Sequence, residues 1–342
     1  MRLPLSTLLI FLLSIAVGCG PDSDKGGQHK SFKDPKPTAQ PPAPPPRQNV
    51  ALDPELRAAA DRELSESLKS ADPILRVHAL EGIRDSNSTT HQDEILKALH
   101  DPQPVVRFAA ALTAGELKIA AAHDPLLAIA MDHSENVRVA VRFALHRLGD
   151  YRYSHELEHL ATDASPLVRG NVAFVLGMLG ESSALRILRV LRIDPDPAVR
   201  QQASEAMWRL GDEDGLKDLI GLTYSRYPDD RMIGYLGLAL PGNTKIRQHV
   251  RVGLVAGWPD VSWPEVALVA ARAMGMLGSD EGYAIAQQGA VNADSRQRVQ
   301  AAFAFGAIGR SDAQDILRKL LADSDASVRI AAATAILQLK AG

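Results

Sequence analysis

The chain has almost no cysteine: Cys19 is the single cysteine among 342 residues. This count excludes disulfides within the chain, cysteine-based metal sites and a thiol nucleophile further along the sequence. Aromatic residues are also scarce, at 5% against 46% apolar residues, and this mix favours closely packed helices over a β-sandwich. The net charge of -3 provides no broad basic field, so nucleic acid is not predicted as a partner.

What the sequence does contain is one unit repeated in a fixed phase. An arginine recurs every 31 residues through six positions: Arg76, Arg107, Arg138, Arg169, Arg200 and Arg231. The next step is 36 residues and lands on Ala267, after which 31-residue steps reach Arg298 and Arg329. The sequence therefore predicts nine copies with a single five-residue insertion.

Each copy reads as two short helices closed by a glycine or another turn residue. In the fourth copy the pattern predicts helices over 154–161 and 166–179, with Pro166 in a first helical turn and Gly180 as a left-handed cap. Two short helices cannot bury their apolar stripe alone, so the units must stack on one another. We therefore expect an all-α fold, a right-handed α-solenoid of about 18 helices forming one elongated domain over residues 53–342.

The repeat pattern is specific enough to resemble a known family. Asp-Ala-Ser-Pro-Leu-Val-Arg, Asp-Pro-Asp-Pro-Ala-Val-Arg and Asp-Ser-Asp-Ala-Ser-Val-Arg, each leading into a small-residue helix, resemble the short bacterial HEAT repeats, also called phycobilin-lyase-type repeats. The resemblance covers residues 53–342. It implies a scaffold or protein-binding surface and does not identify a reaction.

An aspartate stands six residues before the repeated arginine in many units. One interpretation is a row of carboxylates for metal or catalysis; the other is a structural ladder in which each Asp accepts loop amides and pairs with an Arg. Other units carry Ser70, Ser225, Val261 or Asn292 at this position, which favours the structural interpretation. The predicted ladder comprises Asp101, Arg107, Asp132, Arg138, Asp163, Arg169, Asp194, Arg200, Asp323 and Arg329.

The repeat becomes irregular between residues 224 and 264. This stretch holds five of the nine Trp and Tyr residues of the chain, namely Tyr224, Tyr227, Tyr235, Trp258 and Trp263. Loop insertions in solenoids often build a binding face, and Trp and Tyr are common interface anchors. The alternative is that these rings fill a gap left by an irregular unit. We predict a partner-binding site here for a protein or peptide.

The N-terminus has the layout of an export signal. Residues 1–18 carry Arg2 and a short apolar run, and the residues before Cys19 resemble the lipobox of bacterial lipoproteins. Ala16 departs from that pattern, where Leu is usual. The resemblance implies lipidation at Cys19 and membrane anchoring, and Gly20 favours the outer over the inner membrane. An ordinary cleaved signal or an uncleaved anchor is the alternative.

Residues 19–52 follow as a tether without apolar periodicity. Seven prolines lie between Pro35 and Pro46, which predicts a partly extended, otherwise disordered spacer. The alternative is a ligand for a proline-binding module.

No motif for chemistry stands out. The chain is similar in its repeats to deoxyhypusine hydroxylase, which binds iron through several His-Glu pairs, but His155-Glu156 is the single pair of that form here. His155 and His159 share a helix face, yet zinc would need a third ligand that the sequence does not supply. Phycobilin lyases act on cytoplasmic pigments, which conflicts with an export signal. No metal, cofactor, small-molecule substrate or catalytic residue is predicted.

The sequence thus predicts a membrane-tethered, non-enzymatic scaffold that binds protein or peptide partners. The alternative is an enzyme or enzyme accessory of the lyase or hydroxylase type. The last helical segment, 330–339, has an apolar face at the chain's end, where solenoids usually carry a polar cap. We expect it either to contact a partner or second copy, or to be capped sufficiently by Gln338 and Lys340.

Overall fold

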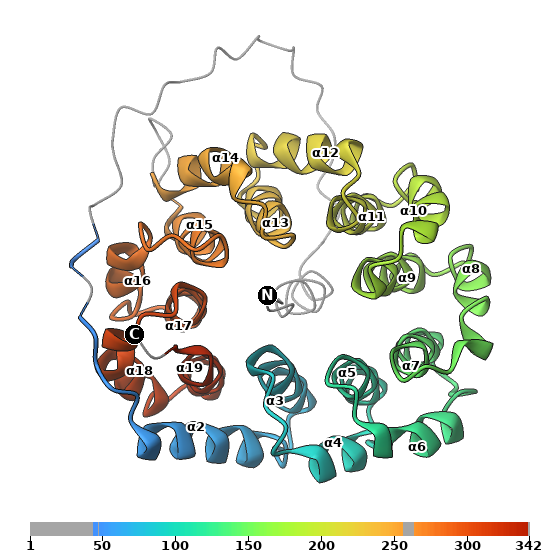
Figure 1. Cartoon of the computed structure of the whole chain (residues 1–342), viewed down its shortest axis with the longest axis horizontal. Coiled ribbons are helices and arrows are strands. Elements are labelled where there is room, and N and C mark those ends of the chain that lie inside the picture. The colour runs from blue at the N-terminus through green and yellow to red at the C-terminus, as the bar shows by residue number, and fades with distance from the viewer. Residues whose placement is uncertain (1–43, 47, 256–262, 341–342) are drawn as a thin grey trace.

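The computed structural model describes residues 44–46, 48–255 and 263–340. Within these ranges it contains 18 α-helices and no strand. They alternate between an outer and an inner layer (Figure 1). The outer helices are α2 (Pro54–Ser67), α4 (Gln92–Ala98), α6 (His123–Ala128), α8 (Glu156–Leu160), α10 (Leu185–Leu191), α12 (Glu213–Thr223), α14 (Arg247–Arg251), α16 (Tyr283–Gly289) and α18 (Gln314–Leu321). The inner helices are α3 (Pro73–Ser86), α5 (Pro104–Glu116), α7 (Glu135–Arg147), α9 (Pro166–Leu179), α11 (Pro197–Arg209), α13 (Pro228–Ala239), α15 (Pro264–Met276), α17 (Ser295–Ile308) and α19 (Ala326–Gln338). The predicted solenoid of two-helix units is confirmed.

Short 3-10 turns accompany several outer helices. They are η1 (Ala120–Ala122), η2 (Tyr151–Tyr153), η3 (Ser182–Ala184), η4 (Thr244–Ile246), η5 (Val252–Leu254) and η6 (Ser311–Ala313). None of the helices among the described residues has the length and apolar content needed to cross a membrane.

The ends of the inner helices follow the turn chemistry of the sequence. Six of them are followed by a glycine with positive φ, as at Gly180 (φ 76°), and Asn87 and Lys118 adopt the same left-handed conformation after the first two inner helices. At the start of α11, the side chain of Asp196 accepts the amides of Ala198 and Val199 at 2.8 and 3.3 Å. Caps of this kind satisfy backbone groups that the helix leaves unpaired.

Small residues let neighbouring inner helices approach closely. A β-carbon on Gly177 in α9 would lie 2.8 Å from Cβ of Ala206 in α11, closer than real contacts allow. The stripe formed by Val168, Val172 and Val175 on α9 is buried, as the periodicity predicts. Close packing between units therefore supplies the continuous core that a single unit lacks.

The stack of units closes on itself, which corrects the expectation of an elongated domain. The last helix, α19, packs against α2 and α3 of the first unit, so the outer and inner layers form two concentric circuits (Figure 1). Across this seam, Arg57 donates to the carbonyls of Ile336 and Leu337 at 3.4 and 3.3 Å. The apolar face of the C-terminal helix is thus covered by the first unit of the same chain.

Candidate functional site

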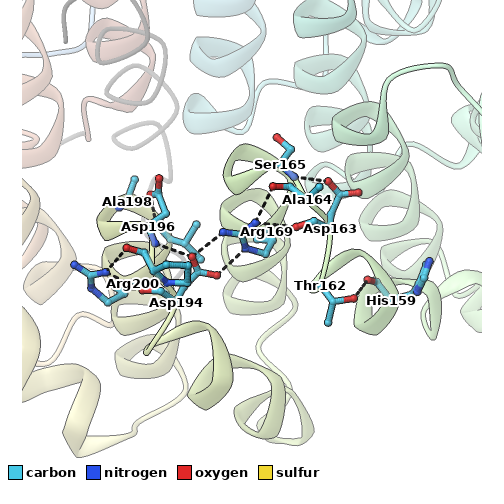
Figure 2. Close-up of polar contacts among 12 residues, drawn as sticks. His159, Thr162, Asp163, Ala164, Ser165, Arg169, Asp194, Asp196, Ala198 and Arg200 are labelled. Carbon is cyan, nitrogen blue, oxygen red and sulfur yellow. Dashed lines mark hydrogen bonds and ion pairs between the residues drawn. The ribbon is translucent and has the colours of Figure 1, made fainter. Parts of the chain in front are cut away.

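The repeated arginine and aspartate form a ladder between successive units, shown in Figure 2. Arg169 donates through Nε and Nη2 to the two carboxylate oxygens of Asp194 at 2.7 and 2.8 Å. Its Nη1 donates to the carbonyls of Asp163 and Ala164 at 2.8 and 3.1 Å. One guanidinium therefore binds the loop of its own unit and, in a bidentate pair, the loop of the next.

The same geometry recurs around the circuit. Bidentate pairs join Arg76 to Asp101, Arg107 to Asp132 and Arg298 to Asp323. Three rungs differ. The side chain of Arg138 donates to Glu135 of its own helix and to the carbonyl of Asp132, and that of Arg200 donates to the carbonyls of Asp194 and Pro195. The side chain of Arg231 donates to the carbonyl of Ser225.

At the seam, Arg329 has no following aspartate loop. Its Nε donates instead to Glu63 of α2 at 3.0 Å, while its Nη1 donates to the carbonyl of Asp323 at 2.9 Å. The ladder thus continues from the last unit to the first, using a carboxylate outside the repeat register.

The ladder carboxylates are committed to these contacts. The guanidinium of Arg169 holds the pKa of the Asp194 carboxyl below its usual range, and Arg298 does the same for Asp323. Each aspartate also accepts an amide two residues on, as Asp194 does from Asp196 at 2.9 Å. Their lowered pKa and their hydrogen bonds give Asp194 and Asp323 a structural role and make them poor general bases.

The helix that carries His155 and His159 does not assemble a metal site in the described part of the chain, where no group of three potential His, Cys, Asp or Glu ligands lies together. His155 precedes α8 and His159 lies within it, its carbonyl accepting the Thr162 hydroxyl at 2.8 Å. Glu156, between them, is bound by the guanidinium of Arg142. This helix is fastened to α7 by that ion pair.

A Ser-His-Glu contact, which the sequence did not indicate, joins α7 to two turns. His146 Nδ1 lies 2.7 Å from the Ser154 hydroxyl, and its Nε2 lies 2.8 Å from a carboxylate oxygen of Glu181. The ring of Tyr151 meets the imidazole edge-on with centroids 4.7 Å apart. Half of the Glu181 side chain is exposed, so water reaches its carboxylate. We therefore interpret the contacts of His146 with Ser154 and Glu181 as structural contacts that join two units.

Glu81 and Arg272 are two of the charged residues that are buried on the inner helices. Burial raises the pKa of Glu81 on α3 to about 8 and lowers the pKa of Arg272 on α15 to about 10, and the two groups attract each other. A cavity of about 40 Å³ borders Glu81, with Phe303 of α17 and Thr334 of α19 on its other sides. This volume accommodates a few waters and is far below the several hundred Å³ of a typical ligand site.

The five aromatic residues predicted as a partner-binding site are placed in different environments. Tyr224 and Tyr227 are exposed, at 53% and 54%. Tyr235 is buried, and burial raises its pKa to about 12. Trp263 caps α15 and packs partly against the core, with the Arg231 guanidinium 5.0 Å from its ring centroid. Trp258 lies outside the described residues.

Exposed apolar side chains mark the turns that join the two helices of a unit. Met131, Ile193 and Val291 are 78%, 78% and 84% exposed, and each directly precedes the ladder position of its unit. Tyr224 occupies the same position in its unit. We call this row of four residues the loop rim. The signal that the sequence offered is an apolar or aromatic residue directly before the ladder position in each of these four units.

These observations define a closed α-solenoid with a structural ladder and an apolar rim. The family model for HEAT repeats matches residues 61–146, 154–239 and 260–338. The chain therefore belongs to the HEAT-repeat family.

Among solved structures, the chain is similar to the complex of CpcE and CpcF of phycocyanin lyase from Nostoc, at 16% identity and a TM-score of 0.44, covering 77% of this chain and 98% of that one. It is also similar to human deoxyhypusine hydroxylase in complex with glycerol, at 21% identity and a TM-score of 0.38, covering 74% and 96%. No curated protein sequence matches the chain.

Proposed function

We propose that this chain is a membrane-tethered, non-enzymatic scaffold whose loop rim binds a protein partner. The exposed apolar row carries the proposal. Single exposed apolar residues are common on protein surfaces, but Ile193 and Tyr224 stand at the same position of successive units, and Met131 stands at that position two units before Ile193. Because the ladder stacks the intra-unit turns, such residues line up along one edge of the circuit.

Two more exposed apolar residues lie at the N-terminal ends of inner helices. Leu167, the second residue of α9, is 49% exposed, and Tyr227 caps α13, where the Arg226 guanidinium lies 4.8 Å from its ring centroid. An aliphatic and aromatic surface bordered by arginine has the composition of a protein-docking site. Of the aromatic residues predicted from sequence, Tyr224 and Tyr227 belong to this surface, whereas the buried Tyr235 does not.

The rim is testable by site-specific cross-linking in cells that make the full chain. A photo-cross-linking residue at Ile193 should capture a discrete protein partner. The same residue at exposed Glu213, the first residue of the outer helix α12, is the matched control and should capture little. Replacing Met131 and Tyr224 with aspartate should lower the yield at Ile193 about tenfold, since charge opposes burial of an apolar rim. Equal yields at both positions would contradict the rim as the docking surface.

Tethering is the second part of the proposal and rests on the leader and Cys19. Two or three acyl chains on one cysteine would hold the protein on a membrane durably, where a single chain would not. We place it on the periplasmic or surface side of a bacterial membrane, the outer membrane in preference to the inner.

The lipid anchor predicts a change in localisation. Cys19→Ser in the full chain should move the protein from the membrane to the soluble fraction, because the acceptor thiol is lost. Fractionation followed by immunoblotting measures this, and metabolic labelling with a fatty-acid analogue should disappear in parallel. Retention of the variant in the membrane fraction would show that something other than lipid holds it.

A further inference from the structure

The last residues of the expected tether are bound to the ring. Residues 44–46 and 48–53, which we call the strap, pass outside α18 before entering α2 (Figure 1). Their backbone is hydrogen-bonded to four side chains, those of Arg310 before η6, Ser311 and Asp312 within η6, and Gln314 at the start of α18. Arg310 donates to the carbonyls of Pro45 and Pro46 at 2.7 and 2.9 Å. The Gln48 amide donates to Asp312 at 3.0 Å, and the Val50 amide donates to the Ser311 hydroxyl at 3.1 Å. Gln314 donates through Nε2 to the Ala51 carbonyl at 2.9 Å, and its Oε1 accepts the Asp53 amide at 2.6 Å.

Arg310 is held in place by residues other than the strap. Its guanidinium stacks over the ring of Tyr283, 4.0 Å from the centroid, and donates to both carboxylate oxygens of Asp312 at 2.9 and 2.5 Å. Asp280 adds a contact at 3.4 Å. The stacked, paired cation therefore presents its Nη1 and Nη2 donors to the strap in a fixed orientation.

These contacts suit an extended segment that begins with prolines. Proline has no amide hydrogen and a fixed φ, so Pro45 and Pro46 offer only carbonyls, and Arg310 binds both. Further on, the amides of Gln48 and Val50 are needed as donors, and a proline at either position would leave Asp312 or Ser311 without its bond. The pattern of carbonyl contacts followed by alternating amide contacts thus defines a register for the ligand.

We propose that Tyr283, Arg310, Asp312 and Gln314 form a binding site for extended proline-rich peptides, with the strap as its internal ligand. This assigns the proline-rich segment a binding partner within its own chain. Because the strap is covalently linked, its effective concentration at the site is on the order of millimolar, and it excludes weaker external peptides. A proline-rich peptide in trans binds once the strap is displaced.

The test keeps the full chain and replaces strap residues 44–51 by a glycine-serine sequence of equal length. A fluorescein-labelled peptide with the sequence of residues 41–52 is then titrated, and anisotropy is measured. We expect saturable binding to this strap variant and at least about tenfold weaker apparent affinity for the unaltered chain, whose site is filled. A peptide with glycine in place of Pro45 and Pro46 should bind the strap variant more weakly.

Arg310→Gln in the strap variant should abolish peptide binding, because the two carbonyl contacts and the stacked cation are lost. Arg186→Gln is the matched control, since the side chain of Arg186 is 72% exposed and paired with Glu158 away from the strap. Circular dichroism confirms that each variant is helical. The proposal is overturned if the folded strap variant shows no saturable binding, if the unaltered chain binds equally well, or if the glycine-substituted peptide binds as tightly.

Discussion

Arg169→Ala should lower the free energy of unfolding by about 3 kcal/mol, because it leaves a largely buried carboxylate without its counterion. The side chains of Arg169 and Asp194 are only 12% and 7% exposed, and the pair is bidentate. The two loop carbonyls that Nη1 reaches also lose their donor. Urea denaturation followed by circular dichroism measures the loss.

Arg138→Ala is the matched control at the neighbouring rung. Arg138 occupies the same repeat position, but its carboxylate contact is Glu135 in its own helix, and the two side chains are 22% and 42% exposed. A pair of that exposure contributes about 1 kcal/mol or less. Equal losses for the two variants would show that the bond between units is not what stabilises the ladder.

The same pair predicts a pH dependence. The pKa of Asp194 is lowered in the folded state by Arg169, so the pair's stabilisation is fully present above the unfolded carboxyl pKa of about 4 and is lost as pH falls through the lower folded pKa. The difference in unfolding free energy between the unaltered chain and Arg169→Ala should therefore shrink below about pH 4. A constant difference from pH 7 to pH 3 would contradict this origin.

The ladder was predictable because its information is local and repeated. An Asp six residues before an Arg recurs at a 31-residue step, and this pattern specifies both partners of the ladder. Other units carry Ser70 or Asn292 at the Asp position, which indicates that the position has a structural role. The structure adds the direction of pairing, in which Arg169 binds Asp194 of the next unit. The period alone leaves this direction open, because it places an aspartate loop on both sides of each arginine.

Ring closure could not be predicted in this way. Whether nine units form an open or a closed solenoid depends on the small rotation between units, which accumulates over the whole stack. The carboxylate that completes the ladder, Glu63, lies outside the Asp register, and the strap contacts of Arg310 join residues more than 260 positions apart. Neither the Glu63 contact nor the strap contacts follow the 31-residue period, so the sequence pattern does not indicate them.

The aromatic cluster illustrates a different limit. A high density of Trp and Tyr in the sequence does not show which of these side chains are exposed. Tyr235 is buried and packs so closely on Gly253 that a β-carbon on Gly253 would lie 2.6 Å from the Tyr235 ring. Tyr224, in contrast, is exposed. Aliphatic residues such as Ile193 complete the loop rim, and their meaning appears only when exposure is compared at equivalent repeat positions.

Gly275→Ala should lower the free energy of unfolding by about 2 kcal/mol, although alanine is the better helix former. The new β-carbon would lie 2.6 Å from the Ile308 amide nitrogen and 2.8 Å from the Ala307 carbonyl carbon. Both are backbone atoms of α17, so relief requires α15 and α17 to separate. In a circuit, that displacement is also transmitted to the seam, where α19 meets the first unit.

Gly221→Ala makes the identical chemical change and should have the opposite sign. Gly221 is an exposed position within α12, and no atom lies within 4 Å of its prospective β-carbon. Alanine there should raise the free energy of unfolding by about 0.5–1 kcal/mol, because it restricts the unfolded chain and favours the helix. Urea midpoints for the two variants should move in opposite directions from the unaltered chain. A shift in the same direction would show that helix–helix clearance is not what requires glycine at position 275.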